Sequence, residues 1–172
     1  MALRPWSEGD ARSAAALWGG DPEILRWTGV EPGQSVARTL EWARFTRSES
    51  AAGRGFYFVV LVDGALAGAC DVRLPERTDP RIGELGYLLA ERFRGRGVMT
   101  AALSLLIGWS FGSPLSLARI QALTHPDNVR SARVLERLGF AREGLLRAYR
   151  PACEGREDRV MWSLLPVDWR AL

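Results

Sequence analysis

The chain has 172 residues, 47% of them hydrophobic and 25% charged, which is the composition of a folded globular protein and excludes a disordered or fibrous one. All 23 basic residues are arginine, so phosphate-loop NTPases and Schiff-base enzymes, which need a lysine, are excluded. The formal net charge of +3 comes from arginines scattered among acids, which is weak support for a nucleic-acid partner.

The beginning of the chain is predicted to be mainly helical. A short strand is expected first, around Leu3–Pro5. Capping residues and apolar spacing then predict helices over about 8–18, from Asp21 onward, and from Val36 to about Arg47. Pro22 stands at a first-turn position that helices favour for proline.

A meander of strands is predicted next. Residues 57–62 are β-branched and aromatic, which favours a strand, and Asp63-Gly64 is a hairpin signal leading into a second strand over 65–74. These two strands are expected to be antiparallel neighbours. After a loop with two prolines, Ile82–Leu89 is predicted to form a third strand.

The next predicted element is a helix that begins directly after Gly97. Its apolar residues recur at the helical period of 3.6 and should face the core: Met99, Leu103, Leu106 and Ile107. A short strand over Arg119–Thr124 follows this helix.

The chain is predicted to close with a helix and a hairpin. The helix opens near Asn128 and ends at Gly139, a residue suited to a left-handed helix terminus. Its inner stripe holds Ser131, Leu135 and Leu138. Strands over 141–149 and 157–163 flank a turn around Glu154-Gly155. The order predicts an α/β (α+β) fold with one mixed, mostly antiparallel sheet flanked by helices, in a single domain over 1–172.

The segment Arg94-Gly95-Arg96-Gly97 joins the third strand to the next helix. Such a turn presents backbone N–H groups at the positive end of a helix dipole, and this arrangement binds phosphate. The glycines free the backbone to curl, and the arginines add permanent positive charge. A tight strand-to-helix connection explains the same residues equally well, so the turn alone leaves both interpretations open.

The run from Arg94 to Met99 resembles motif A of the GNAT acetyltransferase superfamily, Arg/Gln-x-x-Gly-x-Gly/Ala, with Met99 where the family has a small residue. Further segments resemble the branch that includes the ribosomal-protein N-terminal (alanine/serine) acetyltransferases: 83–87, 128–131, 136–140 and 143–144. The resemblance covers nearly the whole chain and is firmest between Tyr57 and Ser163.

This resemblance implies an acetyl-CoA site and direct acetyl transfer to an amine. The pyrophosphate would lie on backbone N–H groups of one turn: Arg94, Gly95, Arg96, Gly97, Val98 and Met99. The pantetheine arm would pair with the strand end at Leu88 and Leu89, where neighbouring strands separate. Arg94 is also a candidate for direct phosphate contact, and an exposed arginine that serves solubility is the alternative.

Glu84 is the leading candidate for the catalytic base. Strand alternation places it with Ile82, Gly86 and Leu88 on an otherwise apolar row, where desolvation would raise the pKa of its carboxyl. The alternative is a structural ion pair with one of the many arginines. A peptide α-amine needs only modest help, because its pKa is about 8 against about 10.4 for a lysine side chain.

Ser131 is the candidate for an acid or thiol-orienting group. Many superfamily members have a tyrosine acid at a position that falls here on Leu135, which cannot donate a proton, and the branch resemblance draws attention to Ser131 instead. Asn128, three residues earlier on the same helix side, could bind the pantetheine amide. The alternatives are a helix cap for Asn128 and a small packing residue for Ser131.

Four other residues have secondary interpretations. Cys70 lies inside a predicted strand and is interpreted as a small buried hydrophobe, not a nucleophile. Trp27 is expected to border the acceptor groove, and His125 is a minor alternative base. Glu143 belongs to the branch pattern and is expected to orient a neighbouring arginine.

The combined prediction is an acetyl-CoA-dependent N-acetyltransferase that acts on a primary amine. The preferred acceptor, a protein or peptide N-terminal α-amine, follows from the branch resemblance alone. A small-molecule (antibiotic or metabolite) amine acetyltransferase is the nearest alternative. Alternatives of other classes are a non-catalytic module that senses acyl-CoA and, from the sequence pI of about 9.4, a nucleic-acid-binding domain.

Location and partners are expectations from composition. Cys70 and Cys153 form no Cys-x-x-Cys pair, which favours a reduced, cytoplasmic protein. No apolar run reaches about 18 residues, so no membrane span is expected. The start at Met1 soon turns acidic at Glu8, unlike a signal peptide. The expected partners are acetyl-CoA and an amine acceptor, with a homodimer as an open alternative, and no metal is expected from a chain whose one histidine is His125.

Overall fold

The computed structural model describes residues 1–75, 79–152 and 155–171. Seven strands of these residues form one sheet in the order β1-β2-β3-β4-β5-β7-β6. All neighbours pair antiparallel except β4 and β5, which are parallel. The strands are β1 (Ala2–Pro5), β2 (Gly55–Val62), β3 (Ala65–Arg73), β4 (Ile82–Leu89), β5 (Arg119–Thr124), β6 (Ala141–Pro151) and β7 (Arg156–Leu164).

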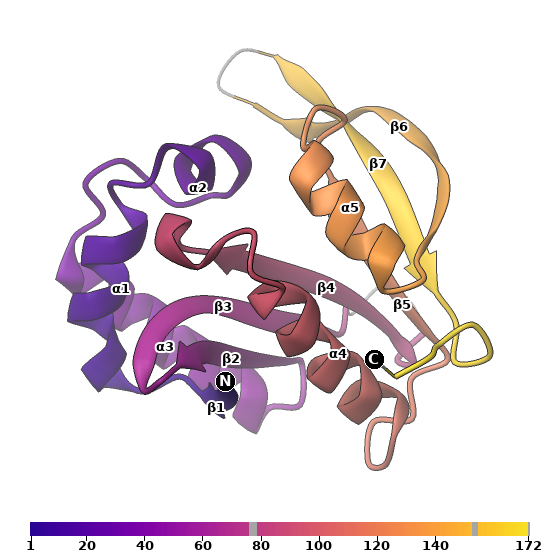
Figure 1. Ribbon diagram of the computed structural model, residues 1–172, viewed down its shortest axis with the longest axis horizontal. Coiled ribbons are helices and arrows are strands. Elements are labelled where there is room, and N and C mark those ends of the chain that lie inside the picture. Colours follow the sequence, from indigo (N-terminus) through magenta and orange to yellow (C-terminus); the bar gives the residue numbers. More distant parts are fainter. Residues whose placement is uncertain (76–78, 153–154, 172) are drawn as a thin grey trace.

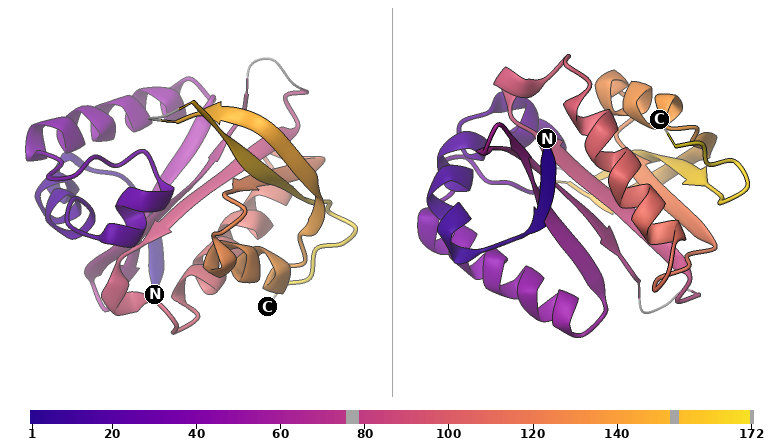
Figure 2. Two further views of the ribbon diagram at one scale, coloured as in Figure 1. Left: turned by 90° about the horizontal axis from the view of Figure 1, so that it is seen from above. Right: turned by 60° about the horizontal axis from the view of Figure 1, so that its bottom comes forward.

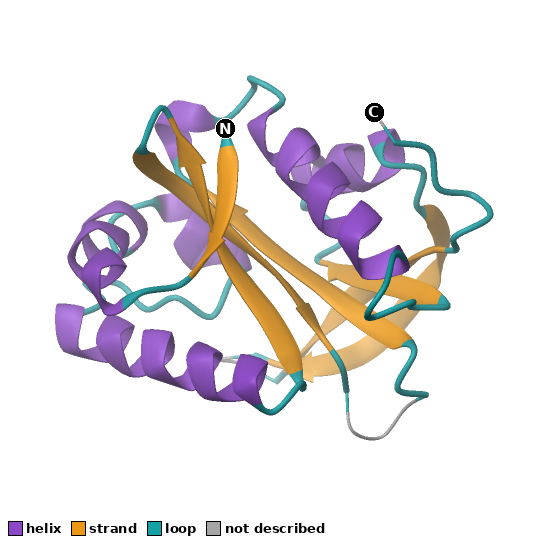
Figure 3. Cartoon of the chain, turned by 90° about the horizontal axis from the view of Figure 1, so that it is seen from below, coloured by secondary structure: helices purple, strands orange, loops and turns teal. Residues whose placement is uncertain are grey.

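Helices cover both faces of this sheet (Figure 1). One face carries α1 (Ala11–Trp18), α2 (Pro22–Trp27) and α3 (Val36–Ala51), and the other carries α4 (Val98–Phe111) and α5 (Val129–Arg137). Figure 3 shows the two groups on opposite sides of the strands, and Figure 2 shows the same separation from two further directions. Two short 3-10 turns complete the fold: η1 (Glu8–Asp10) and η2 (Glu91–Phe93). None of the described helices has the length and apolarity to cross a membrane.

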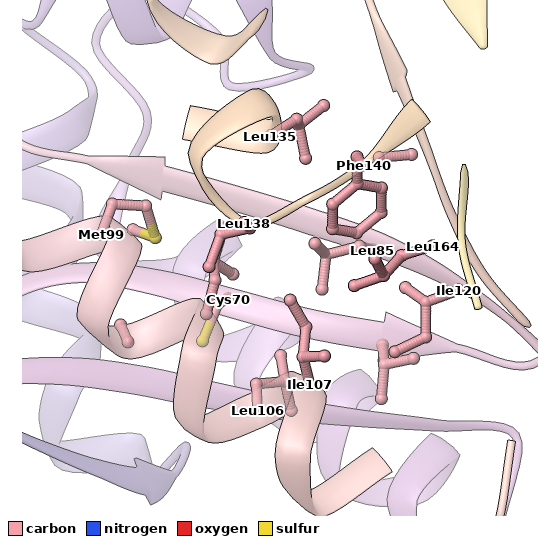
Figure 4. Close-up of a cluster of buried hydrophobic side chains, with 14 of the residues drawn as sticks. Cys70, Leu85, Met99, Leu106, Ile107, Ile120, Leu135, Leu138, Phe140 and Leu164 are labelled. Carbon is pink, nitrogen blue, oxygen red and sulfur yellow. The ribbon is translucent and has the colours of Figure 1, made fainter. Parts of the chain in front are cut away.

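Two hydrophobic clusters hold the helices to the sheet. The larger cluster lies under α4 and α5 and includes the whole predicted stripe of α4: Met99, Leu103, Leu106 and Ile107. Figure 4 shows part of this stripe beside Leu135 and Leu138 of α5. The smaller cluster packs α1, α2 and α3 on the other face through Trp18, Ile24, Ala43 and Tyr57. Burial of these apolar faces stabilises the layered arrangement.

The predicted fold class and element order are confirmed, with small differences in boundaries. The helix predicted over 8–18 is divided into η1 and α1. Asp10 explains the division, because its carboxylate accepts hydrogen bonds from the N–H and hydroxyl groups of Ser7 and pairs with Arg4 at 2.6 Å. These bonds close a separate 3-10 turn before α1 begins.

Two further predictions concern the ends of elements. The helix predicted to end near Arg47 continues to Ala51. The chain reverses between β6 and β7 as predicted, but Cys153 and Glu154 lie outside the described residues.

β4 and β5 pair along only part of their length. Their partners run from Ile82 with Arg119 to Leu85 with Ala122, whereas β4 itself continues to Leu89. On the side toward β5, residues 86–89 therefore have no strand partner within the described chain. The separation of strands expected near Leu88 and Leu89 is present.

Candidate active site

A cavity of about 650 Å³ lies where α2, the end of β4, the start of α4 and α5 meet. This volume falls within the usual range for small-molecule sites. The cavity collects most of the residues predicted from the sequence: Leu88, Leu89, Arg94, Gly95, Gly97, Val98, Met99, Asn128 and Ser131. Arg96 and Glu84 are not among its lining residues.

The cavity extends around the free edge of β4. Tyr87 and Leu88 both line it, although consecutive strand residues point to opposite faces of a sheet. The cavity therefore reaches the face under α4 and α5 through Tyr87, and the face under α1–α3 through Leu88.

The glycine turn offers backbone donors from Gly95 onward, whereas the Arg94 N–H donates to the Glu91 carbonyl oxygen at 3.0 Å. Gly95 and Gly97 have φ angles of 72° and 73°, in the left-handed region that favours glycine, and a Cβ added at either would meet nothing within 4 Å. Gly97 caps α4 without a side chain, so the first N–H groups of the helix have no partner in the helix itself. The side chain of Met99 is buried in the hydrophobic core (Figure 4), and the residue also lines the cavity.

Arg94 forms contacts within the protein. Its guanidinium is 2.6 Å from the Asp21 carboxylate and donates to the Leu89 carbonyl oxygen at 3.0 Å. Asp21 also caps α2 and accepts a hydrogen bond from the Glu91 N–H. Burial raises the pKa of Asp21, but the hydrogen bonds from Arg94 and the backbone outweigh this and hold the pKa below its ordinary value. Arg94 therefore ties α2 to the glycine turn.

Other arginines supply positive charge at this end of the cavity. Arg133 and Arg137 line it from α5, and neither they nor Arg96 form an ion pair within the described residues. Arg130, also on α5, lies 3.6 Å from the Glu23 carboxylate. Unpaired guanidinium groups beside free backbone N–H groups suit a phosphate-bearing ligand.

Ser131 lies in a hydrogen-bonded group. Its Oγ is 2.5 Å from the Tyr87 hydroxyl, which also donates to the Ser131 carbonyl oxygen at 3.2 Å. Asn128 caps α5 by accepting from the Ser131 N–H at 3.0 Å, and it lines the cavity as well. Burial raises the pKa of Tyr87, and the hydrogen bond with Ser131 offsets part of this effect. The phenol is therefore protonated throughout the physiological pH range.

Glu84 has the ion pair that was the alternative to its role as base. It stands opposite Arg73 in the β3–β4 ladder, and its carboxylate accepts from that guanidinium at 2.9 Å. The row expected to be apolar is thus interrupted by a charged partner from the neighbouring strand.

Asp71 is a second carboxylate on the same face, directly opposite Gly86. A Cβ on Gly86 would lie 2.8 Å from one Asp71 oxygen and 2.9 Å from the other. Oδ2 is buried and accepts no hydrogen bond, although Arg73 Nε lies 3.1 Å away. Burial raises the pKa of Asp71 to about 6, with Arg73 opposing the shift and Glu84 adding to it.

An aromatic contact closes the cavity on the α2 side. Trp27, which lines the cavity, has its ring 5.1 Å from that of His125 in the β5–α5 loop. The Nδ1 atom of His125 accepts a hydrogen bond from the Asp127 N–H at 3.1 Å. His125 is therefore a partner of α2 and not an isolated surface residue.

Three residues outside the cavity match their predicted environments. Cys70 is 1% exposed and burial raises its pKa to about 12, which confirms the interpretation as a buried hydrophobe. Leu135 is fully buried in the core. Glu143 holds Arg119 through two hydrogen bonds of 2.7 and 2.6 Å, as expected, and these bonds with that from Ser163 lower its pKa to about 2.

Sequence reasoning missed the roles of Tyr87, Asp21 and Asp71. In the sequence, Tyr87 was noted only as part of a motif. Because side chains alternate along a strand, Tyr87 points to the face opposite to that of Gly86, which is the face covered by the helix that bears Ser131. Asp21 was recognisable as a helix cap, but its contact with Arg94 joins residues far apart in the chain. Asp71 was visible as one acid within an apolar strand, and its face depends on the register with β2.

Comparisons with known proteins agree on one kind of relative. A family model described as an acetyltransferase (GNAT) domain matches residues 1–141. A Bacillus licheniformis protein described as an uncharacterized N-acetyltransferase, p20, is 30% identical over 171 residues, which are 98% of this chain and 94% of that protein. The Escherichia coli ribosomal protein uS5-alanine N-acetyltransferase is 34% identical over 85 residues, 49% of this chain and 43% of that enzyme.

A solved structure extends the comparison to three dimensions. Mycobacterium smegmatis RimJ in complex with CoA-disulfide superimposes with a TM-score of 0.87 and 28% identity. The match covers 96% of this chain and 81% of that protein.

Proposed function

The chain belongs to the GNAT acetyltransferase family, and we propose that it transfers an acetyl group from acetyl-CoA directly to a protein or peptide N-terminal α-amine. One observation carries this proposal. The open N-terminus of α4, with its two left-handed glycines, adjoins the unpaired end of β4 inside a single cavity.

These features fit the parts of acetyl-CoA. The backbone N–H groups from Gly95 to Met99 would hold the pyrophosphate, with Arg133 and Arg137 adding charge. The Arg94 N–H would not take part, because it already donates to the Glu91 carbonyl oxygen at 3.0 Å. The end of β4 at Leu88 and Leu89 would pair with the pantetheine arm along its free edge, because no described strand lies on that side. The Leu89 carbonyl oxygen already accepts a hydrogen bond from Arg94. Arg94 would act through Asp21 by fixing the turn, because its donors already have partners in the protein.

Ser131 and Tyr87 would serve the departing sulfur. When Tyr87 gives its one hydroxyl proton to Ser131 Oγ and not to the Ser131 carbonyl oxygen, the serine hydroxyl proton is free to point into the cavity. A hydroxyl aimed at the sulfur would stabilise its developing negative charge and direct the thioester. Asn128 would keep this geometry by capping α5 and would present its side-chain amide to the pantetheine.

The acceptor's proton would leave to a carboxylate on the β4 face under α1–α3, where Glu84 and Asp71 lie on either side of Arg73. An α-amine suits a modest base, since about a tenth of such amines, with a pKa near 8, is already neutral at pH 7. The Escherichia coli relative is named as an N-acetyltransferase that acts on an alanine of ribosomal protein uS5, which supports the same acceptor class.

An acceptor panel tests the proposal. We expect thiol release from acetyl-CoA with short peptides that carry a free α-amine. Thiol release should be much slower with aminoglycosides and small metabolite amines. A preference for the small amines would establish the alternative acceptor class. Binding of acetyl-CoA in calorimetry without transfer to any amine would instead favour an acyl-CoA sensor, and failure to bind coenzyme A would overturn the proposal.

Two serine-to-alanine variants, one in the cavity and one outside it, test the role of Ser131. Ser131→Ala should lower kcat about 10²-fold at saturating acetyl-CoA if its hydroxyl assists the sulfur. Ser48→Ala on α3, away from the cavity, is the matched control and should leave kcat unchanged. A kcat for Ser131→Ala close to that of the control would remove Ser131 from the mechanism.

A further inference from the structure

Asp71 is the most unusual charged group on the face of the sheet where the acceptor would approach. Its side chain is only 20% exposed, and its Oδ2 atom is buried without a hydrogen bond. Arg73 Nε lies 3.1 Å from this oxygen but forms no hydrogen bond with it, so burial of the carboxylate is only partly compensated. A buried and incompletely paired carboxylate is a candidate for a functional role.

The position of the carboxylate is set by β4. Asp71 occupies the space above the Cα of Gly86, where any other residue would place its own Cβ. Gly86 is the first residue of β4 past its last pair with β5, and Leu88, two residues on along the same face, lines the cavity. Two residues of strand span about 7 Å, so Asp71, which does not itself line the cavity, lies opposite a residue about 7 Å along β4 from Leu88.

The charged and titratable neighbours of Asp71 are few. Arg73 lies between two acids, with its Nε 3.1 Å from Asp71 and its guanidinium 2.9 Å from Glu84. Tyr57 stands opposite Asp71 on β2, and burial with the charge of Asp71 raises the pKa of that phenol to about 12, so it stays neutral. Glu49 of α3 and Arg54, which follows that helix, pair with each other, and the charges of both act on Tyr57. With two acids and one arginine, the cluster of Asp71, Arg73 and Glu84 carries one net negative charge.

We propose, on the basis of the acetyltransferase function, that Asp71 receives the acceptor's ammonium group and takes its proton, while Glu84 positions Arg73. The ammonium nitrogen loses one proton to an Asp71 oxygen and becomes a nucleophile. Its lone pair then forms the bond to the acetyl carbonyl carbon. The bond from that carbon to sulfur breaks, and the sulfur takes the second nitrogen proton. Asp71 releases its proton to solvent, so amide, free thiol and one proton are the products.

The pH profile of kcat/KM for a short peptide with a free α-amine tests this assignment. The wild type should show an acidic limb near pH 6, because Asp71 must be ionised to accept the proton. Asp71→Asn should lower kcat/KM at pH 7 about 10²-fold. Its acidic limb should move toward about pH 8, because the variant depends on amine that is already neutral.

Two variants serve as comparisons. Asp79→Asn changes an exposed acid paired with Arg81 in the loop before β4 and should leave the profile unchanged. Glu84→Gln should keep the limb near pH 6 with a smaller loss, since a positioning residue leaves the titrating group in place. An Asp71→Asn profile that keeps the limb near pH 6 with a loss of less than about threefold would overturn the assignment.

Further measurements separate the possible failures. Coenzyme A binding to Asp71→Asn, measured by calorimetry, should match the wild type, which shows that a lost rate is not a lost fold. If Asp71→Asn fails to fold, the ¹³C chemical shifts of the aspartate carboxyl groups in the wild type can be followed as a function of pH. If no aspartate carboxyl has a titration midpoint near pH 6, the assignment is overturned. A wild type that transfers acetyl to no amine would overturn the acetyltransferase proposal itself, and this inference with it.

Discussion

At the scale of one residue, the raised pKa of Asp71 suits a catalytic acid–base group but lowers the stability of the folded protein. Its pKa of about 6 in the fold lies above the ordinary 3.8 because burial disfavours the ionised form. The folded state therefore binds more protons than the unfolded state between these values, and stability falls as pH rises from about 4 to 6. Above pH 6 the full penalty, roughly 3 kcal/mol, remains.

This penalty predicts that Asp71→Asn is more stable than the wild type in neutral solution. The asparagine keeps the size of the side chain and removes the charge. We expect a gain of about 1–3 kcal/mol in the free energy of unfolding at pH 8 and little difference at pH 4. Urea unfolding at the two pH values measures both, and an Asp71→Asn protein that is less stable at pH 8 would contradict the account.

The glycine turn is the feature that matters most at the scale of elements. Gly97→Ala forces a residue with a Cβ into the left-handed region, which costs about 1–2 kcal/mol of stability. The new methyl group would also lie among the donors proposed to hold the pyrophosphate. We therefore expect a loss of coenzyme A affinity of at least tenfold in calorimetry.

Gly53→Ala is the matched control for this effect. Gly53 has a φ of 69° and open space around it, but it follows α3 and does not line the cavity. The same substitution there should cost a similar amount of stability and leave coenzyme A binding unchanged. Equal binding losses in the two variants would show that strain, and not the position of the turn, determines affinity.

A second element-scale feature is the attachment of α2 to the same turn. Asp21 caps α2 and accepts hydrogen bonds from Glu91 and Arg94, which belong to the connection between β4 and α4. The helix that carries Trp27 is thereby held against the turn proposed to bind the coenzyme. One carboxylate thus positions both sides of the cavity.

At the scale of the whole molecule, we propose that residues 1–172 form one cooperative domain. The two hydrophobic clusters lie on opposite faces of a continuous sheet, and Leu17 packs against both. Loss of either cluster would expose the strands that support the other. We expect far-UV and near-UV circular dichroism to report one coincident urea transition, and two separate transitions would contradict a single domain.

Local patterns let the sequence determine most of the architecture by itself. Strand alternation, helical spacing and turn residues depend on neighbours in the chain, and they placed β4, β5 and the core stripe of α4. The glycine turn and the helix that begins at Asn128 were also local signals. Most residues on the coenzyme side of the candidate site could therefore be named from the sequence. The exceptions are Arg96, which does not line the cavity, and the partner of Arg94.

The acceptor side was decided by tertiary structure. The hairpin pairs Leu61 with Leu66, and a regular ladder would continue to place Tyr57 opposite Cys70. A bulge between Val60 and Leu61 shifts the register by one residue and sets Tyr57 opposite Asp71 instead. Because a shift of one residue exchanges the two faces of a strand, Asp71 is turned toward the acceptor face by packing that no short stretch of sequence encodes.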